Sequence, residues 1–172
     1  MKLAVYATCR NQAPYVPRWV SSMAKADDLY VLDLGSTDGS RELLQAAGCR
    51  VTESHTNLRD GNAARNEALA LLPEDTDICV FTRLDEVFLP GWGDLLRQCW
   101  LPWTQQVYFQ GLQTIRGGRP LLCQLGCIHA RHDFLWQAAD MAAPVYTGPY
   151  NPVIVYIPEL QLLSLPIPGS CL

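Results

Sequence analysis

Short apolar runs that alternate with helical patterns are the feature that most constrains how this 172-residue chain folds. Four apolar runs have the length of strands, at residues 3–7, 29–32, 49–52 and 78–82. Between and after them, apolar side chains recur at helical spacing, at residues 15–26, 40–47, 62–72 and 92–99. This alternation predicts βαβ units and a mostly parallel sheet, with the almost wholly apolar run at 78–82 near its centre.

Beyond Pro102 the pattern changes. Residues 106–114 and 120–128 alternate like strands on either side of Gly117 and Gly118, which predicts an antiparallel hairpin. From residue 144 onward the chain is rich in proline and contains one further predicted strand, at 153–157. We therefore expect one Rossmann-like, three-layer α/β domain over 1–172, with a parallel half to about residue 100 and a smaller, partly antiparallel half at 101–172.

The composition excludes several classes of protein. Hydrophobic residues make up 49% of the chain and charged residues 17%, which indicates a packed core rather than disorder. A net charge of -4 without a basic stripe argues against nucleic-acid binding. The sequence has no apolar run of about 20 residues, so we expect no membrane span. The first residues do not resemble a signal peptide, so we expect a cytoplasmic protein with reduced cysteines.

Polar residues stand at the ends of the predicted strands, where ligands of open α/β sheets bind. They are Thr8 and Asn11 after the first strand, Asp33 after the second, Asp60, Arg65 and Asn66 after the third, and Asp85 after the fourth. An alternative is that Asp33 only caps the next helix and that Asp85 only begins a turn. Neither a Gly-x-Gly-x-x-Gly turn nor a Gly-Lys-Ser/Thr loop is present, so dinucleotide and P-loop sites are not indicated.

Four motifs occur in an order and spacing that resemble the family 2 glycosyltransferases, which have the GT-A fold. They are "ATCRNQ" (7–12), "LDLGSTDGS" (32–40), "DGNAARNEAL" (60–69) and "LDEVFLPGW" (84–92). The resemblance covers about the first 100 residues, is weak to about residue 140 and is absent beyond. It implies an enzyme that transfers a sugar from a nucleotide-diphosphate sugar to an acceptor hydroxyl, with inversion; the acceptor could be a saccharide, a lipid or a protein.

The same resemblance implies roles for the residues at the strand ends. Asp33 would hold the nucleotide base or its ribose, as an acceptor-only carboxylate can. The residues that would line the nucleotide pocket with it are Thr8, Asn11, Ser36 and Asp38. Those that would lie beneath the diphosphate and sugar are Asp60, Arg65 and Asn66. Arg65 has an alternative role as a structural ion-pair partner of Asp60.

One departure from the family concerns the metal site. The family places an Asp-x-Asp motif at the end of the fourth strand, where it holds the Mn²⁺ or Mg²⁺ that bridges the two phosphates. Asp85 matches the second acid, but Arg83 stands in place of the first. Two hypotheses remain open: Arg83 binds a phosphate and reduces the need for a metal, or catalysis is lost while ligand binding is retained.

A second departure concerns the catalytic base. The stretch "IHARHDFLW" (128–136) is similar to one that some relatives continue with a His-Glu pair, whereas here "QAADMAAP" follows. Asp133 and Asp140 remain as candidate catalytic carboxylates beside Asp85, and His129 or His132 could assist or bind the metal. Each of these residues could equally belong to a polar strand and turn.

Three further hypotheses follow from the sequence. Cys123 and Cys127 with the two nearby histidines suggest a zinc site, but the two cysteines of a regular strand there would lie about 13 Å apart. A degenerate family member would bind a nucleotide sugar without turnover. A structural or interaction protein would reuse the fold and self-associate through its proline-rich tail.

Overall fold

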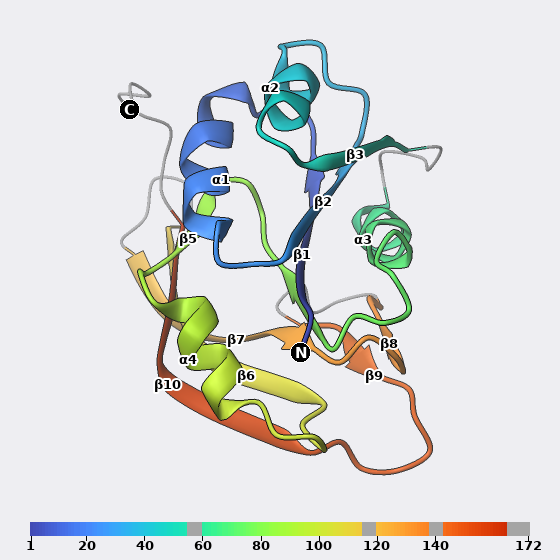
Figure 1. Ribbon diagram of the computed structural model, residues 1–172, viewed down its shortest axis with the longest axis vertical. Coiled ribbons are helices and arrows are strands. Elements are labelled where there is room, and N and C mark those ends of the chain that lie inside the picture. Colours follow the sequence, from blue (N-terminus) through green and yellow to red (C-terminus); the bar gives the residue numbers. More distant parts are fainter. Residues whose placement is uncertain (55–59, 115–119, 138–142, 165–172) are drawn as a thin grey trace.

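The computed structural model describes residues 1–54, 60–114, 120–137 and 143–164, and shows a curled sheet of eight strands with helices packed around it (Figure 1). The strand order is β3-β2-β1-β4-β7-β6-β10-β5, and β8 and β9 form a separate pair. The first strands are β1 (Leu3–Cys9), β2 (Asp28–Asp33), β3 (Arg50–Glu53), β4 (Ile78–Phe81) and β5 (Glu86–Phe88). The later strands are β6 (Gln106–Thr114), β7 (Pro120–His129), β8 (Phe134–Leu135), β9 (Val145–Tyr146) and β10 (Ile154–Ser164).

Four helices follow the predicted positions closely. They are α1 (Val16–Met23), α2 (Ser40–Ala46), α3 (Gly61–Ala70) and α4 (Trp92–Cys99). The first is shorter than predicted: it begins at Val16, directly after a 3-10 turn, η1 (Ala13–Tyr15), and ends three residues early, at Met23. Pro14 and Pro17 stand near the starts of these two elements, where a residue without an N–H group is tolerated.

The connections between the parallel strands place the helices on both faces of the sheet. The chain moves outward from β1 to β2 and β3, which are all parallel, and then returns to form β4 on the other side of β1. Because such crossovers are right-handed, α1 and α2 lie on one face and α3 on the other (Figure 1). The strand order therefore reverses between β1 and β4. Open α/β sheets bind their ligands beyond the carboxyl ends of the strands at such a reversal, and we call this region the crevice.

The C-terminal half completes the sheet with antiparallel pairs. The predicted hairpin is confirmed, since β7 pairs antiparallel with β6 and also with β4. Its turn at Gly117 and Gly118 lies outside the described residues. The last strand is longer than predicted: β10 continues past an irregularity between Ile157 and Gln161 and ends at Ser164. There it pairs with β5, a short buried strand that the sequence did not predict.

A chain of buried hydrogen bonds joins the two halves of the sheet. Trp136 Nε1 donates to the Tyr6 hydroxyl at 2.9 Å, and that hydroxyl lies 2.8 Å from His129 Nε2. His129 Nδ1 lies 2.7 Å from the Ala130 carbonyl oxygen, so Nδ1 carries the proton and Nε2 accepts from Tyr6. Burial lowers the pKa of His129 to about 4, and the ring is therefore neutral in the folded protein.

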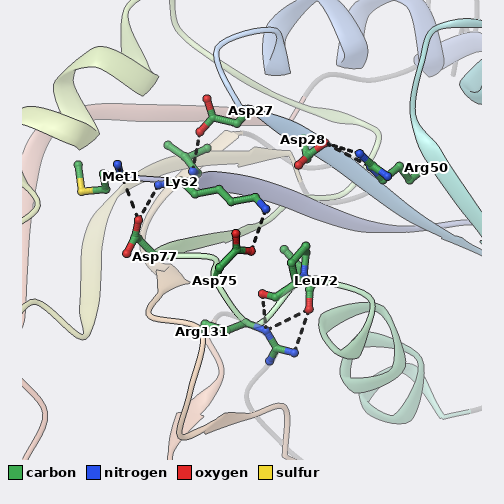
Figure 2. Close-up of polar contacts among 11 residues, drawn as sticks. Met1, Lys2, Asp27, Asp28, Arg50, Leu72, Asp75, Asp77 and Arg131 are labelled. Atoms are coloured by element: carbon green, nitrogen blue, oxygen red, sulfur yellow. Dashed lines mark hydrogen bonds and ion pairs between the residues drawn. The ribbon is translucent and has the colours of Figure 1, made fainter.

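The amino edge of the sheet is closed by its own polar contacts (Figure 2). The side chain of Lys2 bonds Asp75 at 2.8 Å, and its backbone N–H donates to Asp77 at 2.6 Å. Arg131, which follows β7, donates to the Leu72 carbonyl oxygen at 3.1 Å and so ties the end of β7 to the loop before β4. Among the helices of the described segments, none is long and apolar enough to cross a membrane.

The neutral state of His129 predicts how stability depends on pH. Between the ordinary pKa of 6.5 and the folded value of about 4, the unfolded chain binds a proton that the folded chain excludes. The free energy of unfolding therefore decreases as the pH falls through this window, by at most about 3 kcal/mol. Urea unfolding at about pH 7 and pH 4.5 should show a smaller decrease for His129→Gln than for the parent, whereas the exposed control His132→Gln should retain the parent's decrease. Equal decreases in parent and His129→Gln would contradict the assignment.

Candidate functional site

The crevice between β1 and β4 brings together two of the predicted loops. Asn11, after β1, accepts a hydrogen bond from Thr37 N at 2.8 Å through its side-chain oxygen. Its own N–H donates to Ser36 Oγ at 3.0 Å. These bonds hold the loop after β1 against the loop after β2, and Thr8 lies half-buried at the same strand ends. Asn11 has a φ of 52°, a left-handed conformation that asparagine tolerates better than most residues.

Asp33 holds the turn that follows β2. Its side chain is buried, and its two oxygens accept from Ser36 Oγ at 2.5 Å and from Ser36 N at 3.1 Å. The start of α2 is bonded instead by Asp38, which accepts from Ser40 N and from Ala13 N, each at 3.0 Å. Asp33 therefore does not cap the helix, and its carboxylate retains lone pairs beyond the two that Ser36 uses.

Helix α3 carries Asp60 at its N-cap and Arg65 in its second turn. Asp60 is the N-cap of this helix and accepts from Asn62 N at 3.1 Å and from Ala63 N at 2.9 Å. Arg65 is buried, donates to Asn62 Oδ1 at 3.1 Å, and lies 5.3 Å from the centre of the Phe81 ring. Burial lowers the pKa of Arg65, although a guanidinium in such a site stays charged. The structure thus places a cation beside the carboxyl end of β4.

Trp136 supports this cation and is a residue that the sequence did not single out. The guanidinium of Arg65 lies 5.1 Å from the centre of the Trp136 ring, within cation–π range. Asn66 holds the backbone of Trp136 from both sides: it donates to the carbonyl oxygen at 2.9 Å and accepts from the N–H at 2.8 Å. The amide of Asn66 therefore positions Trp136 in this structure. The motif "IHARHDFLW" ends on this tryptophan, which was the available signal.

The loop after β4 contains a planar ion pair. Arg83 Nε donates to Asp85 Oδ1 and Nη2 to Asp85 Oδ2, both at 2.9 Å. Nη2 also donates to Ser164 Oγ, at the end of β10, at 3.1 Å. Glu86 is buried beneath the pair and accepts from the Arg83 backbone N–H at 2.8 Å. Burial raises the pKa of Glu86, and the neighbouring Arg83 charge opposes this rise.

This arrangement does not fit a divalent cation. Both oxygens of Asp85 accept from Arg83, and a guanidinium beside them repels a metal ion. Mn²⁺ and Mg²⁺ need several oxygen ligands, and a single carboxylate supplies too few. Across residues 1–54, 60–114, 120–137 and 143–164, no three His, Cys, Asp or Glu side chains gather as a possible metal site, and this holds for the suggested zinc site as well.

Two other predicted residues, His132 and Asp133, follow strand β7. Because β7 runs antiparallel to β4 and ends opposite Cys79, the residues that follow it begin at the amino edge of the sheet. There His132 lies 3.7 Å from Glu74, in the loop before β4, so it does not share a metal site with Asp85 as expected. The carbonyl oxygen of Asp133 accepts from Thr147 N at 2.7 Å.

Of the two remaining candidate catalytic residues, the structure describes only one. His129 is buried within the hydrogen-bond chain to Tyr6 and is not available to a ligand. Asp140 lies outside the described residues.

Comparison with known proteins gives a partial match in sequence. No protein-family model matches the chain. A TPR repeat-containing protein from Synechococcus elongatus is 35% identical over 91 residues, which are 52% of this chain and 22% of that protein.

Solved structures match more of the chain. Glucosyl-3-phosphoglycerate synthase from Mycobacterium tuberculosis, in complex with Mg²⁺ and UDP, is 26% identical with a TM-score of 0.53, covering 69% of this chain and 45% of that one. S. aureus TarS, residues 1–349, is 13% identical with a TM-score of 0.60, covering 91% of this chain and 60% of that one. The fold is that of the GT-A glycosyltransferases. The chain thus spans less than two thirds of the length of either structure.

The contact between Asn66 and Trp136 yields a prediction about stability. Asn66→Ala removes both hydrogen bonds and leaves two backbone groups of a buried tryptophan unpaired, so the free energy of unfolding should decrease by about 2 kcal/mol. Denaturant unfolding measures this. Gln45→Ala, an exposed helical position on α2, is the control and should change stability by less than about 0.5 kcal/mol. A decrease for Asn66→Ala no larger than for the control would show that these bonds do not hold Trp136.

Proposed function

We propose that this chain binds a nucleotide-diphosphate sugar at the carboxyl ends of β1, β2 and β4 and transfers the sugar to an acceptor hydroxyl. The support is the GT-A fold together with two guanidinium groups and a buried carboxylate at the crevice where the strand order reverses. The M. tuberculosis synthase, with the same fold, binds UDP. S. aureus TarS binds UDP-GlcNAc, and the structure of that complex is 19% identical with a TM-score of 0.53, covering 70% of this chain and 37% of that one.

The observation that carries the proposal is the exposed face of Arg83. Its Nε and Nη2 groups are bonded to Asp85 and Ser164, which fixes the plane of the guanidinium. Within the described segments Nη1 has no hydrogen-bond acceptor, and 43% of the side chain is exposed. The two N–H groups of Nη1 therefore suit a phosphate oxygen. We assign to Arg83 the charge neutralisation that a metal ion supplies in the related enzymes.

The remaining residues divide between the nucleoside and the sugar. Asp33 positions the nucleoside, together with Thr8 near the end of β1 and Asn11 in the loop that follows. Arg65, held over Phe81 and Trp136, adds a second positive charge beside the diphosphate. In the transfer, the acceptor oxygen bonds to the anomeric carbon as the bond from that carbon to the phosphate oxygen breaks. The leaving diphosphate gains negative charge, which the guanidinium groups stabilise.

A second candidate function is a degenerate transferase that binds the nucleotide sugar without turnover. Two observations favour it: Arg83 occupies both oxygens of Asp85, and Asp133 follows a strand that ends at the opposite edge of the sheet. Asp133 and Asp140 remain the candidate catalytic carboxylates beside Asp85. The two candidate functions, active and degenerate transferase, share the donor site and differ only in whether the sugar is released from the nucleotide.

Donor binding can be tested by thermal unfolding with UDP, GDP, dTDP and CDP, each with and without Mn²⁺. One diphosphate at about 100 times its dissociation constant should add roughly 2.7 kcal/mol to the free energy of unfolding, a shift of several degrees. The shift should occur without Mn²⁺ and should be lost in Arg83→Ala. Arg50→Ala, which removes a guanidinium far from the crevice on β3, is the control and should retain the shift. If none of the four diphosphates stabilises the protein, the proposal is wrong.

Replacing Arg83 by aspartate separates the two candidates. Arg83→Asp restores an Asp-x-Asp pair, so nucleotide binding should fall at least tenfold without Mn²⁺ and recover when Mn²⁺ is added. Isothermal titration measures the affinity, and release of free sugar from the nucleotide sugar measures turnover. If the parent shows no turnover and the variant gains Mn²⁺-dependent hydrolysis, the degenerate candidate is correct. Undiminished Mn²⁺-free binding in the variant would show that Arg83 does not contact the phosphates.

A further inference from the structure

A second cavity lies at the opposite end of the sheet from the nucleotide crevice. It has a volume of about 530 Å³ and is built from the first residues of β6 and β10 with β9 and the loops that flank it. Because β6 and β10 are parallel to β1 and β4, their first residues lie at the amino edge. This volume is within the range of sites that hold small organic ligands.

The lining of this cavity is uncharged and aromatic. Its described lining residues include three tyrosines, Tyr108, Tyr146 and Tyr150, and no aspartate, glutamate, lysine, arginine or histidine. Gln106 and Asn151 contribute amide groups. An uncharged lining gives a phosphate or carboxylate no counter-charge, so a nucleotide or an acidic peptide is a poor fit. Aromatic faces with neutral donors and acceptors suit a ligand that is apolar on its faces and hydroxylated at its edges.

Two of the rings are set in place by glycines and by hydrogen bonds. A Cβ atom at Gly126 would lie 2.7 Å from Cζ of Tyr108, and one at Gly148 would overlap the Tyr146 ring. The Tyr146 hydroxyl accepts from Gln105 Nε2 at 2.9 Å and keeps its own proton for a ligand. The amide of Gln106 donates to the Gly126 and Pro144 carbonyl oxygens at 2.9 and 3.3 Å. The cavity is therefore formed before any ligand arrives, which lowers the entropic cost of binding.

Tyr150 completes the cavity from the outside. Its side chain is 81% exposed, and it stands next to the amide of Asn151. An exposed ring offers its face to the C–H groups of a pyranose, and the amide and phenol groups can bond the hydroxyls at the edge of the sugar. A proline-rich peptide also packs on tyrosine rings, but it presents few hydroxyls or N–H groups to the amides of this lining.

From this lining we infer a binding site for a neutral saccharide. Strand β10 separates the site from the nucleotide crevice: it begins at the cavity with Ile154 and ends with Ser164 beside Asp85. Eleven residues of strand span about 30 Å, so one monosaccharide cannot occupy both places. A saccharide chain held at the cavity would be anchored away from its reacting end. This anchoring role rests on the proposed function, whereas saccharide binding itself does not.

Saturation-transfer NMR and isothermal titration with neutral trisaccharides test the inference. The probes are maltotriose, cellotriose, laminaritriose, chitotriose and mannotriose, with a ten-residue polyproline peptide as the competing class. At least one trisaccharide should bind the full chain, and Tyr150→Ala should weaken it at least tenfold. Because Tyr150 is largely exposed, this variant should fold normally. Tyr150→Phe, which keeps the ring, should retain most of the affinity.

The controls separate this site from the nucleotide crevice. Trp103→Ala removes another exposed aromatic residue outside the cavity and should leave saccharide binding unchanged. Arg83→Ala should also bind the trisaccharide like the parent, even if it binds no nucleotide. No binding by any trisaccharide, equal binding by Tyr150→Ala, loss of binding in Arg83→Ala, or binding of the peptide alone would each overturn the inference. Saccharide binding without nucleotide binding would instead count only against the proposed transferase function.

Discussion

The hydroxyl of Tyr6 is the atom on which the arrangement of the two halves depends. It stands in the middle of β1, accepts from an indole and donates to an imidazole, and so links the parallel half of the sheet to β7 and to Trp136. All three side chains are buried, so each of these groups would lack a partner if one member moved. The direction of the bonds is fixed as well, because an indole can only donate and the Ala130 carbonyl can only accept.

The position of the crevice cations follows from that buried chain. Trp136 lies beneath Arg65 because its indole is bonded to Tyr6 and its backbone to Asn66. Arg83 is positioned independently, by Asp85 and by the end of β10. The two guanidinium groups therefore rest on different parts of the fold, one on the core and one on the last described strand. Each is oriented by packing or by hydrogen bonds made within the chain.

Sequence reasoning succeeded where the pattern was local. Helices and parallel strands are set by apolar spacing within ten or so residues, and these were found close to the predicted positions. Arg83 and Asp85, which the sequence singled out, are bonded to each other in the structure. Contacts between distant segments could not be read from the sequence. Strand β5 has only three residues and pairs with the end of β10 at Ser164, and Trp136 bonds Asn66, which is 70 positions away in the chain.

The place of the later candidates could not be predicted for a related reason. A strand pattern does not reveal whether the strand runs with or against its neighbours. Only the antiparallel pairing of β7 with β4 shows that the loop carrying His132 begins at the amino edge of the sheet, away from Asp85.

The guanidinium of Arg83 has a consequence for how such a site would be supplied and regulated. A bound cation can be exchanged, removed by a chelator or carried away with the product, whereas a side chain stays after every reaction cycle. A diphosphate would leave only by breaking its contacts with the Arg83 guanidinium, which is part of the chain and cannot leave with the product. Release would then become faster as ionic strength rises, and the occupancy of the site would be insensitive to the divalent-ion concentration of its surroundings.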